Sequence, residues 1–474
     1  MSPERRRFAV VGGGIAGLAT AHRLGELCRE RGEPPSLVVL EAAGRFGGLV
    51  RTDRVGAALL EAGPDSFLLA KPAGVELCER LGIDGELLRV DAGGGARVLV
   101  GGRLRELPPG FLMTAPTRLW PVVVSPLFSP WGKLRMALER FVPPAPARDD
   151  ESLASFVTRR FGGEVLERAA EPVLASVFMA DADALSVSAV LPRFVEMERA
   201  FGSVSRGLRR SPGGGPIRPH GGVGFAYPRG GVGRIVERLV ERLPEGAART
   251  RTPLRALARD PDGSWRLITG GSTAILADAV VLACPAYASA PALRDVDADL
   301  AREVGDQRYA SCAIVHLSYR DADVARPLEG FGFFVPRSEG RDLLAASYVS
   351  LKYPGCWPSG ELLVRCFVGG ALRPALAELS EGALVSLVDR ELCAILGIRG
   401  EPRFARATRA VRSMPQYEVG FPRRAASIAR RLASHAGLFL AGGSLGAVGL
   451  PDCIRSGEQA AEAAYGHAAT RSAG

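Results

Sequence analysis

A glycine-rich stretch near the N-terminus constrains the fold of this chain more than any other segment. A short apolar run at residues 8–11 enters a turn with the spacing G-x-G-x-x-G, and a pattern compatible with a helix follows. The first glycine makes the tight turn, the second lets the backbone approach a pyrophosphate, and the third lets the helix pack on the strand. The helix N-terminus then offers free N–H groups to a dianion. The pattern predicts a phosphate cradle for NAD or FAD that comprises Gly12, Gly13, Gly14, Ile15, Ala16 and Gly17.

A second strand and an acidic residue complete this unit. The apolar run at residues 36–40 ends in Glu41, which Ala42 follows. An acid after the second strand of a βαβ unit binds a ribose hydroxyl of the dinucleotide. The order of strand, glycine turn, helix, strand and acid therefore predicts a Rossmann-type domain. The alternative for Glu41 is a solvated carboxylate at the end of a strand.

Length and composition limit the class of protein. The chain has 474 residues, of which 47% are apolar, so we expect two or three domains with a large core. Its 60 basic and 51 acidic side chains give a net charge of +9, and the basic residues are spread along the chain. Such an excess suits anionic lipid or carboxylated ligands, and we see no nucleic-acid motif.

Cysteine and histidine usage indicates the compartment. The eight cysteines and five histidines have neither metal-ligand spacing nor the pattern of a disulfide framework. We therefore expect reduced core cysteines, a cytoplasmic protein and no metal. No apolar segment precedes the first strand, and no run of about 18 apolar residues occurs, so neither a signal peptide nor a spanning helix is predicted.

Two turns after the first unit carry a more specific signal. Residues 44–52 hold Arg45 and the pair Gly47 and Gly48, an arrangement similar to that of amine oxidases and phytoene desaturases, where it lines the flavin side of the pyrophosphate. Residues 61–67 then supply a glycine-proline turn that can approach a ring system closely. An ordinary loop is the alternative in both places. The second turn comprises Gly63, Pro64, Asp65 and Ser66.

The character of the chain changes between residues 107 and 141. This stretch is apolar and aromatic, is broken by prolines, and carries cations on a helical pattern. Trp and Phe enter the acyl boundary of a membrane while Lys and Arg meet the headgroups, so the stretch suits an interfacial segment. A helical hairpin packed on its own domain is an equal alternative. The residues concerned are Trp120, Phe128, Trp131, Lys133, Arg135 and Arg140.

The periodicity of apolar residues predicts the secondary structure of much of the remaining chain. We expect helices at 152–161 and 164–180, with Asp149 or Asp150 as cap, and a loop at 206–222. A helix from 230 to about 243 precedes strands at 250–257, 265–269 and 279–283, the last of which returns to the nucleotide-binding sheet. A largely antiparallel sheet is predicted from strands at 313–319, 332–335, 343–349 and 362–368, followed by a helix at 380–396.

The C-terminal segment resembles a known family. At residues 437–457 a buried strand delivers a second glycine-rich turn to the N-terminus of a closing helix, whose positive end would face the flavin pyrimidine edge. Over nearly its full length the chain resembles the protoporphyrinogen oxidase family, which includes members that oxidise coproporphyrinogen III. The specific marks are Arg45 with Gly47 and Gly48, and residues 61–67, 176–186, 331–336, 368–370, 414–417 and 449–454.

The resemblance implies a fold and its domains. The expected fold is α/β and amine oxidase-like: a Rossmann-type FAD-binding domain, a mixed-sheet substrate domain and a helical membrane-associated insert. The FAD-binding domain would comprise residues 1–95, 211–290 and 426–474, the insert residues 96–210, and the substrate domain residues 291–425. The resemblance implies a peripheral protein at the inner face of the cell membrane. It does not decide whether the protein forms a homodimer.

The resemblance also implies a reaction: oxidation of protoporphyrinogen IX to protoporphyrin IX by FAD and molecular oxygen, in three hydride transfers that each release hydrogen peroxide. No acid–base residue is named, because proton loss would occur on the substrate. The residues that would contact FAD come from the glycine turns, the end of the second strand and the closing turn. They are Gly12, Gly13, Gly14, Ile15, Ala16, Gly17, Glu41, Ala42, Arg45, Gly47, Gly48, Gly63, Pro64, Asp65, Ser66, Leu254, Gly442, Val448, Gly449 and Leu450. The implied substrate contacts are Ser176, Phe331, Phe334, Phe367 and Lys71.

Several positions depart from the family pattern. Ser176 and Ala180 replace two glycines beside the expected macrocycle. An arginine that would hold a propionate is absent after the Gly-Pro turn, so Lys71 would serve as a point charge, unless it is a plain surface lysine. Strand packing is the alternative for the three phenylalanines. Coproporphyrinogen III oxidation, another amine oxidase-like or desaturase-like activity, and a non-catalytic flavin- or tetrapyrrole-binding protein are the competing functions.

Overall fold

A parallel five-stranded sheet forms the first part of the molecule. The computed structural model describes residues 6–56, 58–91, 95–109, 111–112, 115–116, 119–145, 150–210, 224–271, 274–326 and 328–471. The strand order is β12 (Ala248–Arg249), β2 (Ser36–Leu40), β1 (Arg7–Val11), β16 (Ala279–Leu282) and β22 (Leu438–Leu440), and every neighbouring pair is parallel. The expected return of the chain to the nucleotide-binding sheet is confirmed.

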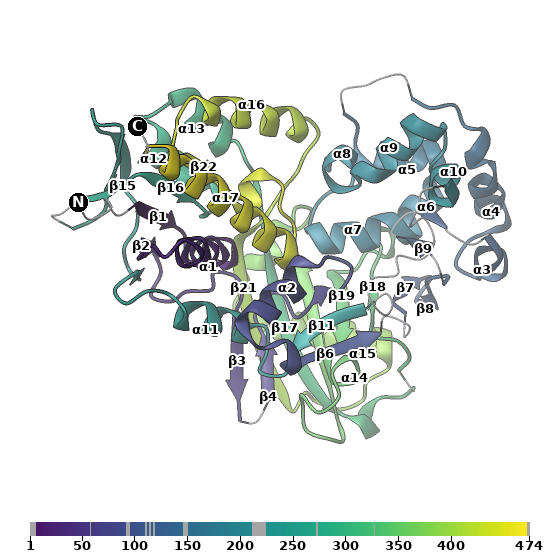
Figure 1. The fold of residues 1–474 in the computed structure, drawn as a ribbon. Helices are drawn as coiled ribbons and strands as arrows, with labels where there is room; N and C mark the ends of the chain where they lie inside the picture. Colours follow the sequence, from purple (N-terminus) through teal and green to yellow (C-terminus); the bar gives the residue numbers. More distant parts are fainter. Residues whose placement is uncertain are drawn as a thin grey trace.

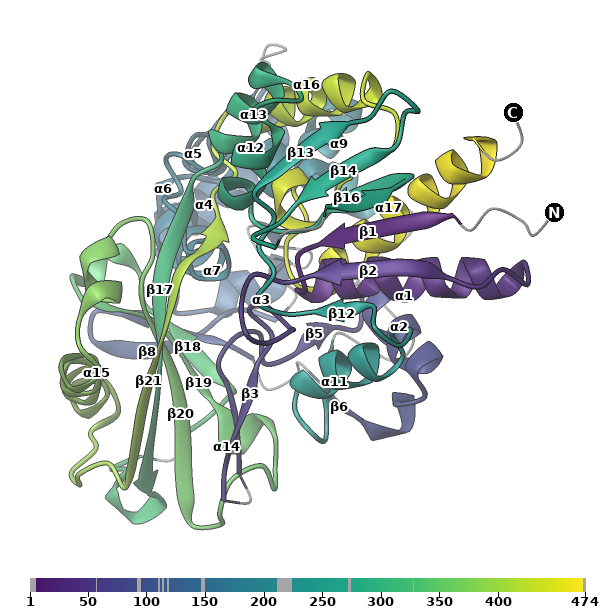
Figure 2. The ribbon, with the colours of Figure 1, turned by 90° about the vertical axis from the view of Figure 1, so that its left-hand side faces the viewer.

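Two helices from opposite ends of the chain pack beside this sheet (Figure 2). They are α1 (Ile15–Glu30) and α17 (Leu450–Arg471). A Cβ at Gly457 would overlap the carbonyl oxygen of Ala16, and the Thr20 hydroxyl lies 3.0 Å from the carbonyl oxygen of Gly457. The glycine therefore lets the two helix backbones approach closely, and the last helix packs directly on α1 of the first βαβ unit.

The second sheet is mixed, as expected. Its order is β21 (Phe404–Pro415), β17 (Tyr309–Arg320), β20 (Glu361–Gly369), β19 (Leu343–Tyr348), β18 (Gly332–Phe334), β7 (Arg97–Val100) and β8 (Arg103–Glu106). Neighbouring strands are antiparallel except β18 and β7. Helix α15 (Glu381–Leu396) covers one face with Leu384, Val388 and Leu392. The hairpin at 97–106 belongs to this sheet, although we expected residues 96–210 to be helical.

The third part is helical and lies at the upper right of Figure 1. A buried ion pair between Arg160 and Glu139 stands at its centre. Arg160 also donates to the carbonyl oxygen of Gly202 (3.0 Å), and Glu139 accepts from Ser203 (2.6 Å). These bonds join three helical segments. The elements are α3 (Leu119–Val124), α4 (Pro130–Ala137), η3 (Leu138–Phe141), α5 (Leu153–Phe161), α6 (Gly163–Val165), η4 (Leu166–Ala170), α7 (Glu171–Phe178), α8 (Val187–Val190), α9 (Pro192–Phe201) and α10 (Val204–Arg210).

Smaller elements connect the three parts. The remaining strands are β3 (Thr52–Val55), β4 (Ala58–Glu61), β5 (Phe67–Leu68), β6 (Leu87–Asp91), β9 (Phe111–Leu112), β10 (Ala115–Pro116), β11 (Gly224–Pro228), β13 (Ala256–Arg259), β14 (Trp265–Ile268) and β15 (Ile275–Ala277). The remaining helices are α2 (Ala73–Leu81), η1 (Asp84–Glu86), α11 (Gly233–Glu241), α12 (Ala286–Leu293), α13 (Ala298–Gly305), η5 (Asp321–Asp323), η6 (Arg337–Glu339), α14 (Val349–Lys352), η7 (Pro374–Glu378), α16 (Phe421–Ala433) and η8 (Gly442–Leu445).

Three local predictions were wrong. Of the strand expected at 250–257, only residues 256 and 257 lie in a strand, β13, and residues 250–255 form an irregular segment in which Arg251 has a φ of +52°. The cap of α5 is Ser152, which accepts from the N–H of Ser155, whereas Asp150 accepts from the N–H of Gly420. The loop expected at 206–222 begins with the last turns of α10, and Asp149 and residues 211–222 lie outside the described residues. Among the described helices, none has the length and apolar character needed to cross a membrane.

Candidate functional site

The first glycine turn has the geometry expected of a phosphate cradle. Gly12 has a φ of +109°, and a Cβ there would lie 2.7 Å from the backbone nitrogen of Cys284 after β16. A Cβ at Gly17 would overlap the carbonyl oxygen of Gly12, whereas one at Gly14 would meet nothing within 4 Å. The first and third glycines are therefore required by packing, and the second faces open space. The first bond of α1 joins the N–H of Leu18 to Gly14 (2.9 Å), so the preceding N–H groups have no partner within the helix.

The acidic residue after β2 is held at the edge of this turn. One oxygen of Glu41 accepts from the N–H of Gly13 (2.7 Å), and the other accepts from the N–H of Ala43 (2.7 Å). The carboxylate is thus fixed beside the turn and half-buried, with Ala42 exposed next to it. This position fits the ribose-binding role expected from the sequence.

The second glycine segment lies directly on the first. The N–H of Gly47 donates to the carbonyl oxygen of Gly13 (2.8 Å), and a Cβ at Gly48 would lie 3.2 Å from the Cα of Gly14. Arg45 holds this loop by donating to the carbonyl oxygens of Gly48 (2.6 Å) and Phe46 (3.1 Å). Burial lowers the pKa of Arg45. The two motifs form one continuous backbone surface.

The closing turn reaches the same surface from the C-terminal end. A Cβ at Gly442 would lie 3.3 Å from the Cβ of Ala16, and the N–H of Gly442 donates to Ser456 (2.9 Å). Gly449 has a φ of +80° and faces open space immediately before Leu450, where α17 begins. Leu254 lies in the irregular segment before β13, packed beside the apolar core of the parallel sheet.

The Gly-Pro turn is fixed by buried charges that sequence reasoning missed. A Cβ at Gly63 would overlap the carbonyl oxygen of Leu49, and Arg365 donates to the carbonyl oxygen of Gly63. Asp65 forms ion pairs with Lys352 (3.2 Å) and Arg365 (3.4 Å). Burial alone would raise the pKa of Asp65, but the two cations outweigh it and hold that pKa well below its usual range. No local spacing could have indicated this cluster, because its members come from distant segments.

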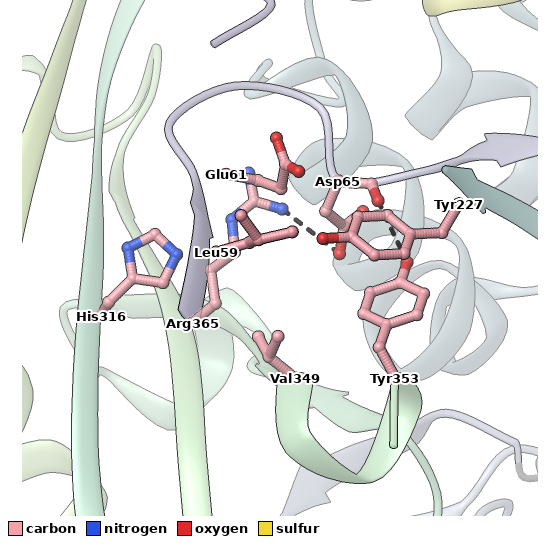
Figure 3. A pocket seen from close by; sticks show the side chains of 8 residues that line it. All are labelled: Leu59, Glu61, Asp65, Tyr227, His316, Val349, Tyr353 and Arg365. Atoms are coloured by element: carbon pink, nitrogen blue, oxygen red, sulfur yellow. Dashed lines mark hydrogen bonds and ion pairs between the residues drawn. The ribbon is translucent and has the colours of Figure 1, made fainter. Parts of the chain in front are cut away.

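A cavity of about 10 Å³, room for about one water molecule, lies beside these charges (Figure 3). Glu61 accepts from the N–H of Val232 (2.9 Å) and from the Thr52 hydroxyl (2.9 Å), and burial raises its pKa to about 7. Burial lowers the pKa of His316 to about 3, so this imidazole is neutral at pH 7. The lining residues are Leu59, Glu61, Asp65, Tyr227, His316, Val349, Tyr353 and Arg365.

Two of the phenylalanines expected at the substrate share one face of the mixed sheet. Phe334 pairs with Ala345, and Ala345 pairs with Phe367, so their side chains lie in one row across β18, β19 and β20. Phe367 packs with Met179 in a small apolar cluster. The hydroxyl of Ser176 lies 3.4 Å from the carbonyl oxygen of Leu344 on β19, which places α7 against the same face.

The remaining expected substrate residues have other surroundings. Phe331 precedes β18, and its N–H donates to the carbonyl oxygen of Gly95 (3.2 Å). Lys71 forms an ion pair with Asp452 in the first turn of α17. Lys71 thus stands beside the closing turn with a carboxylate partner, so binding a propionate would require it to exchange or share that partner.

The stretch at 119–141 exposes an apolar surface, but not all of the expected residues lie on it. Trp120 and Trp131 are 74% and 79% exposed, and Phe141 is also exposed. Phe128, which we expected to face a membrane, is only 3% exposed and stacks on Phe111, because it fills the core of the helical part. Arg135 likewise turns inward and donates to the carbonyl oxygen of Arg160 (3.0 Å).

Comparison with known proteins places the chain among flavoproteins. The model of the family "Flavin containing amine oxidoreductase" matches residues 15–464. The coproporphyrinogen III oxidase of Bacillus subtilis (strain 168) is 32% identical over 97% of this chain and 98% of its own length. The protoporphyrinogen oxidase of Homo sapiens is 30% identical over 97% and 98%. A solved structure from Exiguobacterium sp. 255-15, provisionally named a protoporphyrinogen oxidase, has a TM-score of 0.83 at 29% identity and covers 97% of this chain and 98% of its own.

Proposed function

The chain belongs to the flavin containing amine oxidoreductase family, and we propose that it oxidises a porphyrinogen to the corresponding porphyrin with molecular oxygen as electron acceptor. Relatives that cover nearly its whole length are porphyrinogen oxidases, and the family implies FAD as cofactor. Protoporphyrinogen IX is the substrate expected from the sequence. Coproporphyrinogen III is the second candidate, because relatives from Bacillus subtilis, Staphylococcus aureus and Propionibacterium freudenreichii carry that name.

One structural observation carries the proposal. Three glycine segments that are distant in sequence meet at the start of α1: Gly47 bridges Gly14, Gly48 lies against Gly14, and Gly442 approaches Ala16 in the first turn of the helix. A Cβ at Gly14, or at Gly449 in the closing turn, would meet nothing within 4 Å. The residues present therefore fit a bound dinucleotide, with free helix N–H groups for the pyrophosphate and Glu41 for the ribose.

The expected reaction requires little acid–base catalysis by side chains. FAD held by the glycine turns and Glu41 would supply a two-electron acceptor that oxygen re-oxidises, so that complete oxidation of one porphyrinogen would remove six electrons and six protons in three rounds and form three hydrogen peroxide molecules. The chain would orient a flat substrate: Phe334 and Phe367 offer an apolar face, and α7 closes against the same face at Ser176. Lys71 is proposed to anchor a propionate as a point charge.

The function is tested by mixing the purified yellow protein with each porphyrinogen under anaerobic conditions. We expect flavin absorbance to bleach, and porphyrin fluorescence to grow once oxygen is admitted. Comparing the two substrates side by side assigns the preference. Phe367→Ala should slow porphyrin formation, while Phe404→Ala, on the edge strand beside Trp357, should not. A protein whose flavin is bleached by neither porphyrinogen would refute the proposal.

We also propose that the exposed apolar surface of α3, α4 and η3 binds anionic membranes from the cytoplasmic side. Its support is the pairing of exposed Trp120, Trp131 and Phe141 with Arg140, which lies over the Phe141 ring at 4.7 Å. Changing the three aromatic residues to Ser should reduce retention on vesicles that contain phosphatidylglycerol. Val411→Ser, at an exposed apolar position on β21, is the matched control. Equal retention of the triple variant and the wild type would remove this surface as the anchor.

A further inference from the structure

The dipeptide Gln416 and Tyr417 follows β21 directly and lies between the closing turn and the substrate face. The side chains are almost fully buried, at 6% and 1% exposure. The N–H of Gln416 donates to the carbonyl oxygen of Arg308 (2.9 Å), and the carbonyl oxygen of Tyr417 accepts from the N–H of Ser186 (2.8 Å). These two hydrogen bonds hold the backbone of the dipeptide, so its side chains have fixed positions from which they can bind neighbouring segments.

Tyr417 supports the closing turn. Its hydroxyl oxygen lies 3.0 Å from the carbonyl oxygen of Gly443 and 3.3 Å from that of Ala447, so a single proton is shared between two acceptors. The ring packs against Phe421, with centroids 4.6 Å apart. The hydroxyl therefore fixes the direction of two peptide groups in the turn.

The closing turn needs such a support because of its composition. Gly442, Gly446 and Gly449 all have left-handed backbone conformations, and glycine is the most mobile residue in a loop. A trans peptide directs its N–H away from its carbonyl. When Tyr417 holds the carbonyl of Ala447, the N–H of Val448 points to the opposite side, where the flavin is expected.

Gln416 supports the other wall. Its amide nitrogen donates to the carbonyl oxygens of Phe178 (3.1 Å) and Met414 (3.0 Å). Phe178 ends α7, and the next residue, Met179, has a φ of +52° and packs with Phe367. The amide thus stabilises a strained helix end that shapes the face proposed for the macrocycle.

We propose that Tyr417 is a positioning residue for the flavin and Gln416 a positioning residue for the substrate. Reduction of a flavin places negative charge at its pyrimidine edge, and N–H groups that are already oriented stabilise that charge. Tyr417 acts on this charge through the closing turn, so it sets the reduction potential. Gln416 acts on substrate binding through the end of α7. The inference rests on the proposed function.

The test uses the FAD-loaded full chain and two variants. Tyr417→Phe removes only the hydroxyl, and we expect the equilibrium for flavin reduction to become about tenfold less favourable, which is about 30 mV for a two-electron couple. Its visible flavin spectrum should shift, its hydride-transfer rate should fall, and its KM should stay near the wild-type value. Gln416→Met should raise KM several-fold and leave the potential unchanged.

A matched control separates these effects from loss of stability. Tyr319 is also buried, and its hydroxyl donates to Asp389 (2.7 Å) beneath α15, on the opposite face of the mixed sheet. Tyr319→Phe should lower the melting temperature without changing potential, spectrum or KM. Ser456→Ala loosens the same turn at Gly442 and should shift the potential in the direction seen for Tyr417→Phe, so the test holds even where that variant folds poorly.

Failure of this inference can be distinguished from failure of the proposed function. An unchanged flavin potential in both Tyr417→Phe and Ser456→Ala overturns the inference for Tyr417, and an unchanged KM in Gln416→Met overturns it for Gln416. Failure of the proposed function would instead appear as wild-type flavin that no porphyrinogen reduces, with the potentials still measurable by dye equilibration.

Discussion

The buried carboxyl of Glu61 makes the stability of this protein depend on pH in a direction opposite to that of most acidic groups. Burial raises its pKa from the ordinary 4.5 to about 7, so the folded protein prefers the protonated form. The unfolded chain ionises at the ordinary value. Stability from this group is therefore fully present below pH 4.5 and is lost as pH rises through 7, and at 1.36 kcal/mol for each pH unit the loss is roughly 3 kcal/mol.

The substitution Glu61→Gln isolates this effect. Glutamine keeps an acceptor for the N–H of Val232 but cannot ionise. Between pH 5 and pH 8, the variant should gain about 2 to 3 kcal/mol of unfolding free energy relative to the wild type. Urea unfolding of both proteins at the two pH values measures this gap, and titrations elsewhere in the chain largely cancel in the difference.

A second carboxyl gives a control of opposite sign. Burial would raise the pKa of Glu198, but its bonds to Arg159 and the N–H of Ala145 outweigh burial and lower it. Its contribution is present above the ordinary pKa and is lost as pH falls, so Glu198→Gln should be destabilising by a nearly constant amount from pH 5 to 8. A gap between Glu61→Gln and wild type that is equal at both pH values would refute the reasoning for Glu61.

Three further predictions follow from the packing. Gly17→Ala should unfold or lose FAD because its Cβ would overlap the carbonyl oxygen of Gly12. Gly14→Ala should keep the melting temperature of the wild type and lose FAD, as measured by flavin absorbance per chain. Full FAD occupancy in Gly14→Ala would count against the proposed phosphate cradle. Arg160→Met should cost about 3 to 5 kcal/mol by leaving Glu139 buried without its partner, and thermal unfolding that matches the wild type would contradict this cost. Lys71→Met should raise KM for the porphyrinogen several-fold; a change in melting temperature alone would leave Lys71 as a structural partner of Asp452.

The nucleotide-binding half of the fold was predictable because its signals are local. The spacing of Gly12, Gly14 and Gly17 depends on contacts within a single βαβ unit, and both the sheet order and the bonds of Glu41 confirm its geometry. Four strands of the mixed sheet, β17 to β20, were also predictable from their alternating or continuous apolar runs. The edge strand β21 and the hairpin at 97–106 were not predicted, since charged residues interrupt their apolar patterns.

The remaining features depend on long-range packing. An aromatic, proline-broken stretch does not indicate which of its rings faces inward, so Phe128 was placed on the surface while it lies in the core. The ion pairs of Asp65 join residues from three separate segments, and Lys71 meets Asp452 only because α17 returns to the first domain. Whether residues bind substrate cannot be deduced from periodicity, and Phe331, Phe334 and Phe367 remain predictions in that role.

The parallel sheet has a consequence for the synthesis of the protein in the cell. Its strands come from residues 7–11, 36–40, 248–249, 279–282 and 438–440, so the sheet can be completed only after residue 440 has left the ribosome. Until then β16 has an open edge, and α1 lacks the glycine-mediated partner that α17 provides. Such an edge invites pairing with other chains. The edge of β16 therefore stays unprotected through the synthesis of strands β17 to β21 of the mixed sheet, until β22 pairs with it.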